Sequence, residues 1–538
     1  MSRFHEAALL AVFVLTAGPL AAAKEAEPGF VNGSLDGAYR EDADLRTKVV
    51  LNGWWRWKAD TDEKAEAPPE GPWLYRKVPG IGANFEIRNA QGESAIAKLP
   101  RDERTAMTTG RCWVEREFEI PDEWKDRQVR LIFESVGGDG QVFLDGKPMG
   151  HTWPMRWHHL DLPDPHKSEP YRLTLRCHGV IGNVWLEGLA RQDARVTDSY
   201  LMTSVRDMAA TIRAAGKAGP GAKLRLVVTQ YRKPGETVKT VGPIPLEVKD
   251  GAWSVEHTFD WKDAELWTLS RPHLYQYYVE LLDAEGRVAD RIYPIRFGFR
   301  EVWTRGGDFM LNDRRITLNM DIHTPLATKG GWRGNWPRAG HMSDPEMWRK
   351  AIHRWKRIGI NTAVHRWSTN ADDSTLFRVA DEEGFFISVG VFGLQYGDPE
   401  AMKIPKVMRH KRDMIRYLIL PRRHCPSVVF YYLPGTSNTW DFEPAKLGED
   451  YDAEKLFGRH NRPERELVRQ LDPTRVAFAG SGGGAAEPVH SSMNYIHIDA
   501  DLQVHENWPS AWDKKRNKPL ATYEMAAPPY IADWYQRR

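Results

Sequence analysis

The stretch PSVVFYYLPGTSNTWDFEP, from Pro426 to Pro444, places an apolar strand directly before a polar loop. The residues from Val428 to Tyr432 are β-branched or aromatic, and Pro434 with Gly435 ends the run. A short apolar run bounded by such turn residues is typical of a fully buried strand. The stretch therefore predicts a core strand that runs out into a loop with hydroxyl, amide and carboxylate groups.

Strands of the same kind alternate with helical patterns through the last part of the chain. The helix expected over 343–359 has Ser343 and Glu346 as a capping box, Pro345 in its first turn and Gly359 as its stop. The expected strands cover 316–323, 361–367, 385–392, 427–434, 475–480, 495–500 and 519–524. This alternation predicts a (β/α)8-type TIM barrel over residues 301–538, ending after its seventh strand at Glu524 and lacking the eighth.

Short strands separated by turn residues fill the chain before the barrel. CWVEREFEI at 112–120 alternates polar and apolar residues, and GQVFLDGKPMG at 140–150 carries an Asp-Gly turn. These patterns predict one β-sandwich over residues 24–193 and a second over residues 194–300. The expected fold is therefore a multidomain β plus α/β protein.

The first 23 residues have the pattern of a secretory signal peptide. Arg3 precedes a short apolar run, and Ala21, Ala22 and Ala23 provide a small-residue cleavage site. We therefore expect an exported protein, periplasmic or secreted, without a membrane span. Cys112 and Cys177 lie in one predicted domain and either pair or remain free thiols.

The net charge of +2 gives no electrostatic case for binding nucleic acid. The adjacent histidines of RWHHLD, at 156–161, would point to opposite faces of a strand and make a poor metal pair. The sequence therefore predicts no metal site and no cofactor.

Several stretches in order resemble the family 2 glycoside hydrolases, the group of β-galactosidases and β-glucuronidases. They are LNGWWRW at 51–57, EREFEIPDEWKDRQVRLIFESV at 115–136, ELWTLSRPHLYQYYVELLD at 265–283 and FGFREVWTRGGDFMLNDRRITLNMDIH at 297–323. The resemblance implies a jelly-roll, sugar-binding-like first sandwich, an immunoglobulin-like second sandwich and a carbohydrate substrate. It also implies retaining hydrolysis by two carboxylates about 5–5.5 Å apart.

The resemblance places the nucleophile at Glu524, because KPLATYEMAAP is similar to the family's Lys-Pro…Glu pattern; a glutamate paired with a structural arginine is the alternative. The family's acid/base position instead falls on Thr436, which cannot donate a proton near neutral pH. Asp441 and Glu443 are the candidates that could supply the missing carboxyl group, the alternative being solvated loop charges that cap a following helix. Beside them, Asn438 and Trp440 are candidates for binding sugar hydroxyls and stacking on a sugar ring.

Other candidates for substrate contact lie at further strand ends. In NTAVHRWSTN, His365, Arg366 and Trp367 keep the family's chemical types but change their order, and a structural role at the barrel rim is the alternative. His323 and His497 are further candidates at the mouth, each with a structural role as the alternative. Because the acid/base is altered, a carbohydrate-binding protein without catalytic activity is the second reading of the whole chain.

Overall fold

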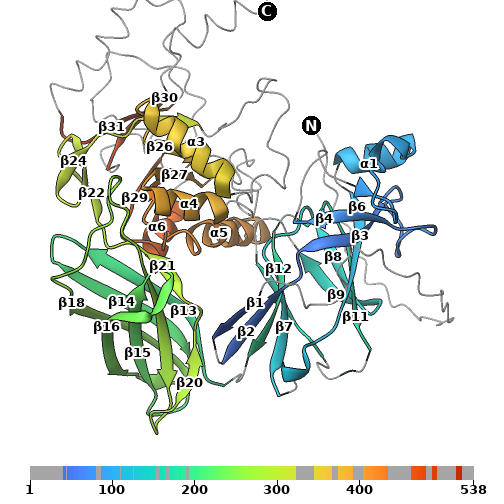
Figure 1. Cartoon of the computed structure of the whole chain (residues 1–538), viewed down its shortest axis with the longest axis horizontal. Coiled ribbons are helices and arrows are strands. Elements are labelled where there is room, and N and C mark those ends of the chain that lie inside the picture. The colour runs from blue at the N-terminus through green and yellow to red at the C-terminus, as the bar shows by residue number, and fades with distance from the viewer. Residues whose placement is uncertain are drawn as a thin grey trace, which may run out of the picture.

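Antiparallel sheets come first along the chain and a parallel sheet with helices follows them in the computed structural model (Figure 1). The structure describes residues 40–523 apart from 44, 80–86, 110, 125, 153–156, 164–166, 168, 181, 190–192, 323–344, 366–373, 392–403, 434–461, 480–487 and 494–515. The predicted signal peptide at 1–23 lies outside these residues. In the described part of the chain, no helix is long and apolar enough to cross a membrane.

The first sandwich has two sheets around one apolar core. Its strands are β1 (Arg40–Ala43), β2 (Arg46–Val50), β3 (Gly53–Ala59), β4 (Leu74–Val78), β5 (Ile87–Arg88), β6 (Cys112–Phe118), β7 (Gln128–Phe133), β8 (Gly140–Leu144), β9 (Lys147–Thr152), β10 (His158–Asp161), β11 (Tyr171–Cys177) and β12 (Val184–Leu189). The sheets have the strand orders β1-β2-β12-β7-β10 and β5-β4-β3-β6-β11-β8-β9. Alternate residues of β7, Val129, Leu131 and Phe133, face the core.

One α-helix and two short 3-10 helices lie between the strands of this sandwich in the sequence. They are α1 (Arg101–Thr109), η1 (Ile96–Lys98) and η2 (Asp122–Trp124). The strand pattern of the sequence did not predict α1, although Asp102 and Glu103 favour the start of a helix through its dipole.

Cys112 and Cys177 lie directly opposite each other on β6 and β11. Both are buried and both are free thiols, so the alternative of a disulfide between them is not seen. The Arg76 guanidinium lies 3.7 Å from the Cys112 sulfur. The hydrogen bond from Cys177, opposed by burial and assisted by the positive charge of Arg76, lowers the pKa of Cys112 to about 7.

The second sandwich is built from β13 to β21. Its strands are β13 (Arg195–Ser204), β14 (Ala209–Lys217), β15 (Lys223–Gln230), β16 (Lys233–Pro245), β17 (Val248–Lys249), β18 (Ala252–Asp260), β19 (Tyr275–Leu282), β20 (Val288–Arg291) and β21 (Ile295–Phe297). One sheet has the order β13-β14-β18-β17; in the other, β16-β15-β19-β20, β21 also pairs with β19. Trp261 fills the core between the sheets, with its ring centroid 5.0 Å from that of Tyr275.

The last part of the chain changes to parallel strands and helices. Its elements are β22 (Val302–Arg305), β23 (Asp308–Leu311), β24 (Arg314–Ile316), β25 (Met320–Ile322), α3 (Pro345–Arg357), β26 (Thr362–His365), α4 (Ser374–Glu383), β27 (Phe386–Gly390), α5 (Pro405–Ile419), β28 (Val428–Leu433), α6 (Arg462–Leu471), β29 (Val476–Ala479), β30 (His490–Met493) and β31 (Leu520–Tyr523). After the antiparallel sheet β22-β23-β24, the strands β25-β26-β27-β28-β29 form a parallel sheet, and β30 pairs with β31 in parallel.

Two apolar clusters cover the two faces of the parallel sheet. The outer cluster joins helices α3 to α6 to the sheet through side chains such as Ile352, Ile415 and Val468. The inner cluster contains Phe386 and Phe430 and extends to residues beside β30 and β31. The strands are buried on both faces, which explains their continuous apolar sequences.

Single elements differ from the predicted ones in two places. The strand expected at 316–323 is split into β24 and β25. Between them, the backbone N–H of Asn319 donates to the side-chain oxygen of Asn361, and the Asn319 side-chain Nδ2 donates to the Gly359 carbonyl. β30 was not predicted, and the sixth strand expected at 495–500 lies outside the described residues. The stop of α3 at Gly359 is confirmed by its left-handed φ of 82°.

Candidate active site at the carboxyl edge of the parallel sheet

The five strands from β25 to β29 end at one edge of their sheet. Their parallel pairing sets Ile322 beside Val364, His365 beside Val389, and Leu433 beside Ala479. Active sites of α/β proteins gather at this carboxyl edge. The segments that follow β25, β26 and β28 therefore leave the sheet from the side where catalytic groups are expected.

Apart from His365, the predicted site residues lie in the segments after these strands or after β30 and β31. They are outside the described residues: His323, Arg366, Trp367, Asn438, Trp440, Asp441, Glu443, His497 and Glu524. Their roles stay predictions, as does the position of Thr436 in place of an acid/base.

His365 is the predicted site residue that the structure describes. It is the last residue of β26 and is buried, with its ring centroid 5.5 Å from that of Phe377 in α4. Ala363, two residues earlier, belongs to the outer cluster, whereas Val364 belongs to the inner one. Alternation along the strand therefore turns His365 toward the helices, which favours the structural alternative for this residue.

Aromatic side chains fill the inner face of the sheet between its edges. The ring centroids of Phe430 and Phe478 lie 5.0 Å apart, and those of Phe309 and Phe430 lie 6.1 Å apart. The same cluster includes Tyr432 of β28 and Ala521 of β31. β31 is thus held by the core that also holds β28, and it ends at the residue before Glu524.

A buried carboxylate, Asp472, joins the opposite, amino edge of the sheet to the second sandwich. It accepts hydrogen bonds from the hydroxyls of Tyr200 (2.7 Å), Tyr431 (2.8 Å) and Thr474 (2.7 Å), and it lies 3.1 Å from the Arg475 guanidinium. Burial alone would raise the pKa of Asp472, but Arg475 and the three hydroxyl donors lower it below its usual value. Asp472 is therefore a structural carboxylate whose ionised form is favoured by its partners.

Two arginines hold the backbone at the start of β28. Arg475 Nη2 donates to the Cys425 carbonyl at 2.8 Å, and Arg300 Nε donates to the Pro426 carbonyl at 3.0 Å. Arg300 also donates to the carbonyl of Val428. Both guanidinium groups are buried. The main-chain carbonyls accept hydrogen bonds from N–H groups that burial would otherwise leave without an acceptor.

A second buried carboxylate, Asp381 of α4, also holds the start of β28. Asp381 accepts the backbone N–H of Ser427 at 2.9 Å and the Arg296 guanidinium at 2.6 Å. The indole N–H of Trp267 donates to the Asp381 carbonyl at 2.9 Å. Residues of the second sandwich and its linker thereby fix the amino end of β28.

Four buried charged residues at the amino edge were not predicted from the sequence: Asp472, Asp381, Arg300 and Arg475. The available signal was a charged residue at the boundary of an apolar element, as in LDPTRVAFA at 471–479, but a helix cap explains such a residue equally well. Among the described residues, no group of His, Cys, Asp and Glu side chains is arranged to hold a metal ion.

Comparison with known proteins agrees with this arrangement. Residues 194–300 match the family model of the glycosyl hydrolases family 2. The chain is 22% identical over 495 residues to a putative β-glucuronidase of Formosa agariphila, covering 85% of this chain and 55% of that protein. It is 22% identical over 506 residues to a β-galactosidase of Enterobacter cloacae, covering 86% of this chain and 45% of that protein. The chain thus spans about half the length of these two relatives.

Solved structures show the same fold. A β-glucuronidase of Bifidobacterium dentium superposes with a TM-score of 0.64 at 18% identity, covering 93% of this chain and 89% of that chain. A family 2 β-galacturonidase from Eisenbergiella tayi superposes with a TM-score of 0.60 at 18% identity, covering 89% of this chain and 81% of that chain. This chain is therefore a divergent protein similar to the family 2 glycosyl hydrolases.

Proposed function

We propose that this chain is an exported, retaining β-glycosidase that hydrolyses O-glycosidic bonds of oligosaccharide or polysaccharide fragments. Residues 1–23 are its export signal, and residues 301–538 are its TIM-type catalytic domain. Residues 24–193 form a jelly-roll sandwich and residues 194–300 an immunoglobulin-like one. The names of its relatives suggest β-glucuronides and β-galactosides as the first substrates to test.

The observation that carries this proposal is the position of β31. This strand ends at Tyr523, so Glu524 follows directly, and Ala521 of β31 packs in the same inner cluster as Phe430 of β28. The residues after β28 and the residue after β31 therefore start from one core. That arrangement supports Glu524 as a nucleophile that attacks the anomeric carbon, with substrate contacts from the segments after the parallel strands.

The proton donor is the unusual part of the mechanism. Asp441 or Glu443 would protonate the leaving oxygen and then activate water, taking the place of the carboxylate that Thr436 does not provide. Asn438 and Trp440 would bind the sugar beside them. Arg366, rather than His365, would meet the substrate after β26, because His365 packs against α4.

The nucleophile is tested with 2,4-dinitrophenyl β-glucuronide and β-galactoside, whose leaving groups need little protonation. We expect the wild-type protein to hydrolyse at least one of them with the β-anomer as first product, seen by NMR. Glu524→Gln should lower kcat by at least about 1000-fold, because the covalent intermediate cannot form. An unchanged kcat in Glu524→Gln would refute the assignment.

Asp441→Asn and Glu443→Gln are the matched carboxylate controls for the same assay. Neither should strongly lower kcat/KM for the dinitrophenyl substrates, because this ratio reports the first step, in which their leaving groups need little protonation. The variant that lacks the proton donor should lower kcat/KM for an alkyl β-glycoside. If both variants hydrolyse the alkyl glycoside like the wild type, neither carboxylate is the acid.

The second candidate function is carbohydrate binding without catalysis. It is favoured by the Pro434-Gly435-Thr436 sequence, which lacks a proton donor at the family's acid/base position. Calorimetric binding of a glycan by a wild-type protein that turns over neither dinitrophenyl substrate would support this function and exclude the hydrolase.

A further inference from the structure

The helix α3 carries cationic side chains on two flanks, and acidic residues neutralise one of them. Arg349 Nε lies 2.8 Å and His353 Nε2 lies 2.7 Å from the two carboxylate oxygens of Glu383, at the end of α4. Lys356 Nζ donates to the backbone carbonyls of Leu269, at 3.4 Å, and of Glu383. These contacts hold α3 against α4 and account for the charges on this flank.

The second flank has no such partners in the part of the chain that the structure describes. Lys350, Arg354 and Arg357 are exposed, and none of their side chains forms an ion pair or hydrogen bond with a described residue. Spacings of four and three residues place them in one row along the helix. We call Lys350, Arg354 and Arg357 the basic stripe.

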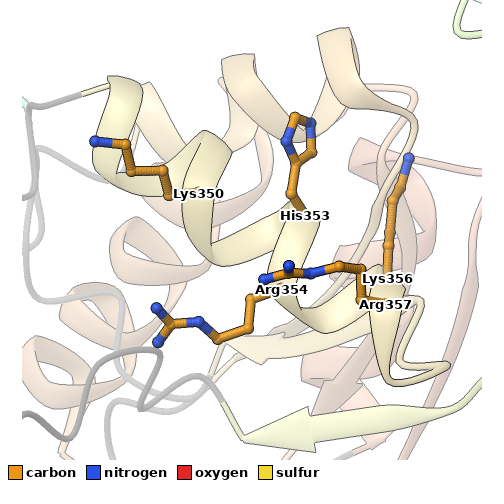
Figure 2. Close-up of a pocket in the computed structure, with 5 residues that line it drawn as sticks. All are labelled: Lys350, His353, Arg354, Lys356 and Arg357. Atoms are coloured by element: carbon orange, nitrogen blue, oxygen red, sulfur yellow. The ribbon is translucent and has the colours of Figure 1, made fainter.

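The basic stripe borders a hollow on the outer wall of the molecule. The hollow has a volume of about 580 Å³ and is lined by the stripe together with His353 and Lys356. In Figure 2 the three stripe side chains extend toward the same side of α3, while those of His353 and Lys356 point away from them. The five residues that line the hollow include the three stripe cations and no carboxylate.

We propose that the basic stripe binds a linear acidic polysaccharide along the outer wall of the catalytic domain. At a helical rise of about 1.5 Å per residue, neighbouring stripe cations are separated by about 4.5–6 Å along the helix axis. A chain of uronic acids carries one carboxylate per sugar, so its negative charges form a single regular row. A single row of cations suits such a single row of charges.

Charge density argues against nucleic acid as the occupant of this site. Duplex DNA carries about one charge per 1.7 Å of axis, and its binders use broad basic surfaces. The net charge of this chain is +2, and the flank next to the stripe is neutralised by Glu383. A narrow row of cations suits a weakly charged linear polymer better.

The direction of α3 connects the stripe to the proposed active site. The helix lies between β25 and β26, so it starts near the carboxyl edge of the sheet and returns toward the amino edge. Lys350 is therefore the stripe residue nearest the carboxyl edge. The choice of a glycan as the polyanion rests on the proposed function, and bound chains would be held close to the catalytic groups.

The test compares the wild type with the triple variant Lys350→Gln, Arg354→Gln, Arg357→Gln, in which glutamine keeps the helix propensity. The probe is a fluorescently labelled oligogalacturonide, with its methyl ester as the uncharged counterpart. The control variant Lys147→Gln, Lys217→Gln, Lys262→Gln removes the same charge from exposed lysines of the two sandwiches. Binding is measured by fluorescence anisotropy at low salt and at about 0.15 M salt.

We expect the wild type and the control variant to bind the acidic probe, more weakly at the higher salt, and not its ester. The triple variant should bind about tenfold more weakly, because it lacks three exposed charge contacts. Equal affinity of the triple variant and the wild type would overturn the proposal. Tighter binding of single-stranded DNA of the same charge than of the oligogalacturonide would overturn it too.

Hydrolysis of the dinitrophenyl monosaccharides is measured on the same samples to separate this proposal from the proposed function. The triple variant should hydrolyse them like the wild type, because the stripe is on the outer wall. Stripe-dependent binding without any hydrolysis would leave the stripe supported and the glycosidase proposal refuted. Hydrolysis without stripe-dependent binding would support the glycosidase proposal and refute the proposal for the stripe.

Discussion

The two edges of the parallel sheet β25 to β29 use polar residues in different ways. At the amino edge, Asp472 and Asp381 are fully buried, and their partners come from the second sandwich, β28 and neighbouring turns. At the carboxyl edge, apolar strands lead directly into the segments that hold the predicted carboxylates. This difference suggests that one edge provides stability and the other provides chemistry, as in other parallel α/β folds.

The largest effect should come from Asp472→Asn. Tyr200, Tyr431 and Arg475 would lose a common anionic acceptor in a site without water access, so the free energy of unfolding should fall by about 3–5 kcal/mol. Urea unfolding followed by tryptophan fluorescence measures this change. The turnover per folded molecule should stay at the wild-type value, since Asp472 is at the edge away from the proposed site.

Asp198→Asn is the matched control for this variant. Asp198 also pairs with an arginine between the two domains, Arg423, but its side chain is 48% exposed. Its loss should cost less stability than the loss of Asp472, because the buried Arg423 keeps its hydrogen bonds to the Ser199 and Leu471 carbonyls. If the two variants lose equal stability, the amino edge does not depend on its buried carboxylate as described.

A smaller effect is expected for Asp381→Asn. The asparagine can still accept the Ser427 N–H, and the Arg296 side chain is 19% exposed and can reach water. The free energy of unfolding should therefore fall by about 2 kcal/mol. The exposed pair of Arg305 and Asp313 provides the control, because Asp313→Asn should change stability by less than about 0.5 kcal/mol. A change for Asp381→Asn no larger than this would show that its contacts are dispensable.

The sequence predicted elements better than it predicted contacts between them. The run from Val428 to Tyr432 is a buried strand, and Gly359 ends α3, because these signals are local. β30 has the sequence HSSM, which carries no strand signal, and its pairing with β31 depends on residues about 30 positions later. Local propensity cannot reveal such a strand.

The prediction of the site from the sequence was limited by a different cause. TAVH at 362–365 is buried on both faces, so the sequence contains no alternation that shows which way His365 points. Asp472 meets Tyr200 across 272 positions of sequence, and a single sequence gives no information on that pairing. Motif resemblance could place Glu524 after a strand, but the buried carboxylates required coordinates.

The amino edge should also respond to pH, through His424. The Tyr277 hydroxyl lies 3.4 Å from Nδ1 of His424. The ring centroids of His424 and Tyr200 lie 5.4 Å apart. The charged groups near His424 are Arg423, Arg475 and Arg296, the first of which pairs with Asp198. Burial, followed by these three cations, lowers the pKa of His424 well below its ordinary value.

A lowered pKa means that the unfolded chain binds the proton before the folded protein does. Above about pH 6.5 the histidine is neutral in both states, and its full contribution to stability is present. As the pH falls below that value, this residue should lower the free energy of unfolding by up to about 1.4 kcal/mol per pH unit. Urea unfolding at several pH values from about 7.5 to about 5.5 measures the slope.

His424→Asn separates this residue from the other titrating groups, because asparagine keeps a polar atom near the Tyr277 hydroxyl and takes up no proton. The variant should show a flatter dependence on pH below about 6.5 than the wild type, whatever its stability at higher pH. His159→Asn, at an exposed position of β10, should keep the wild-type slope. Equal slopes for His424→Asn and the wild type would mean that His424 takes up its proton equally in the folded and unfolded states. The surroundings of His424 at the amino edge would then not lower its pKa.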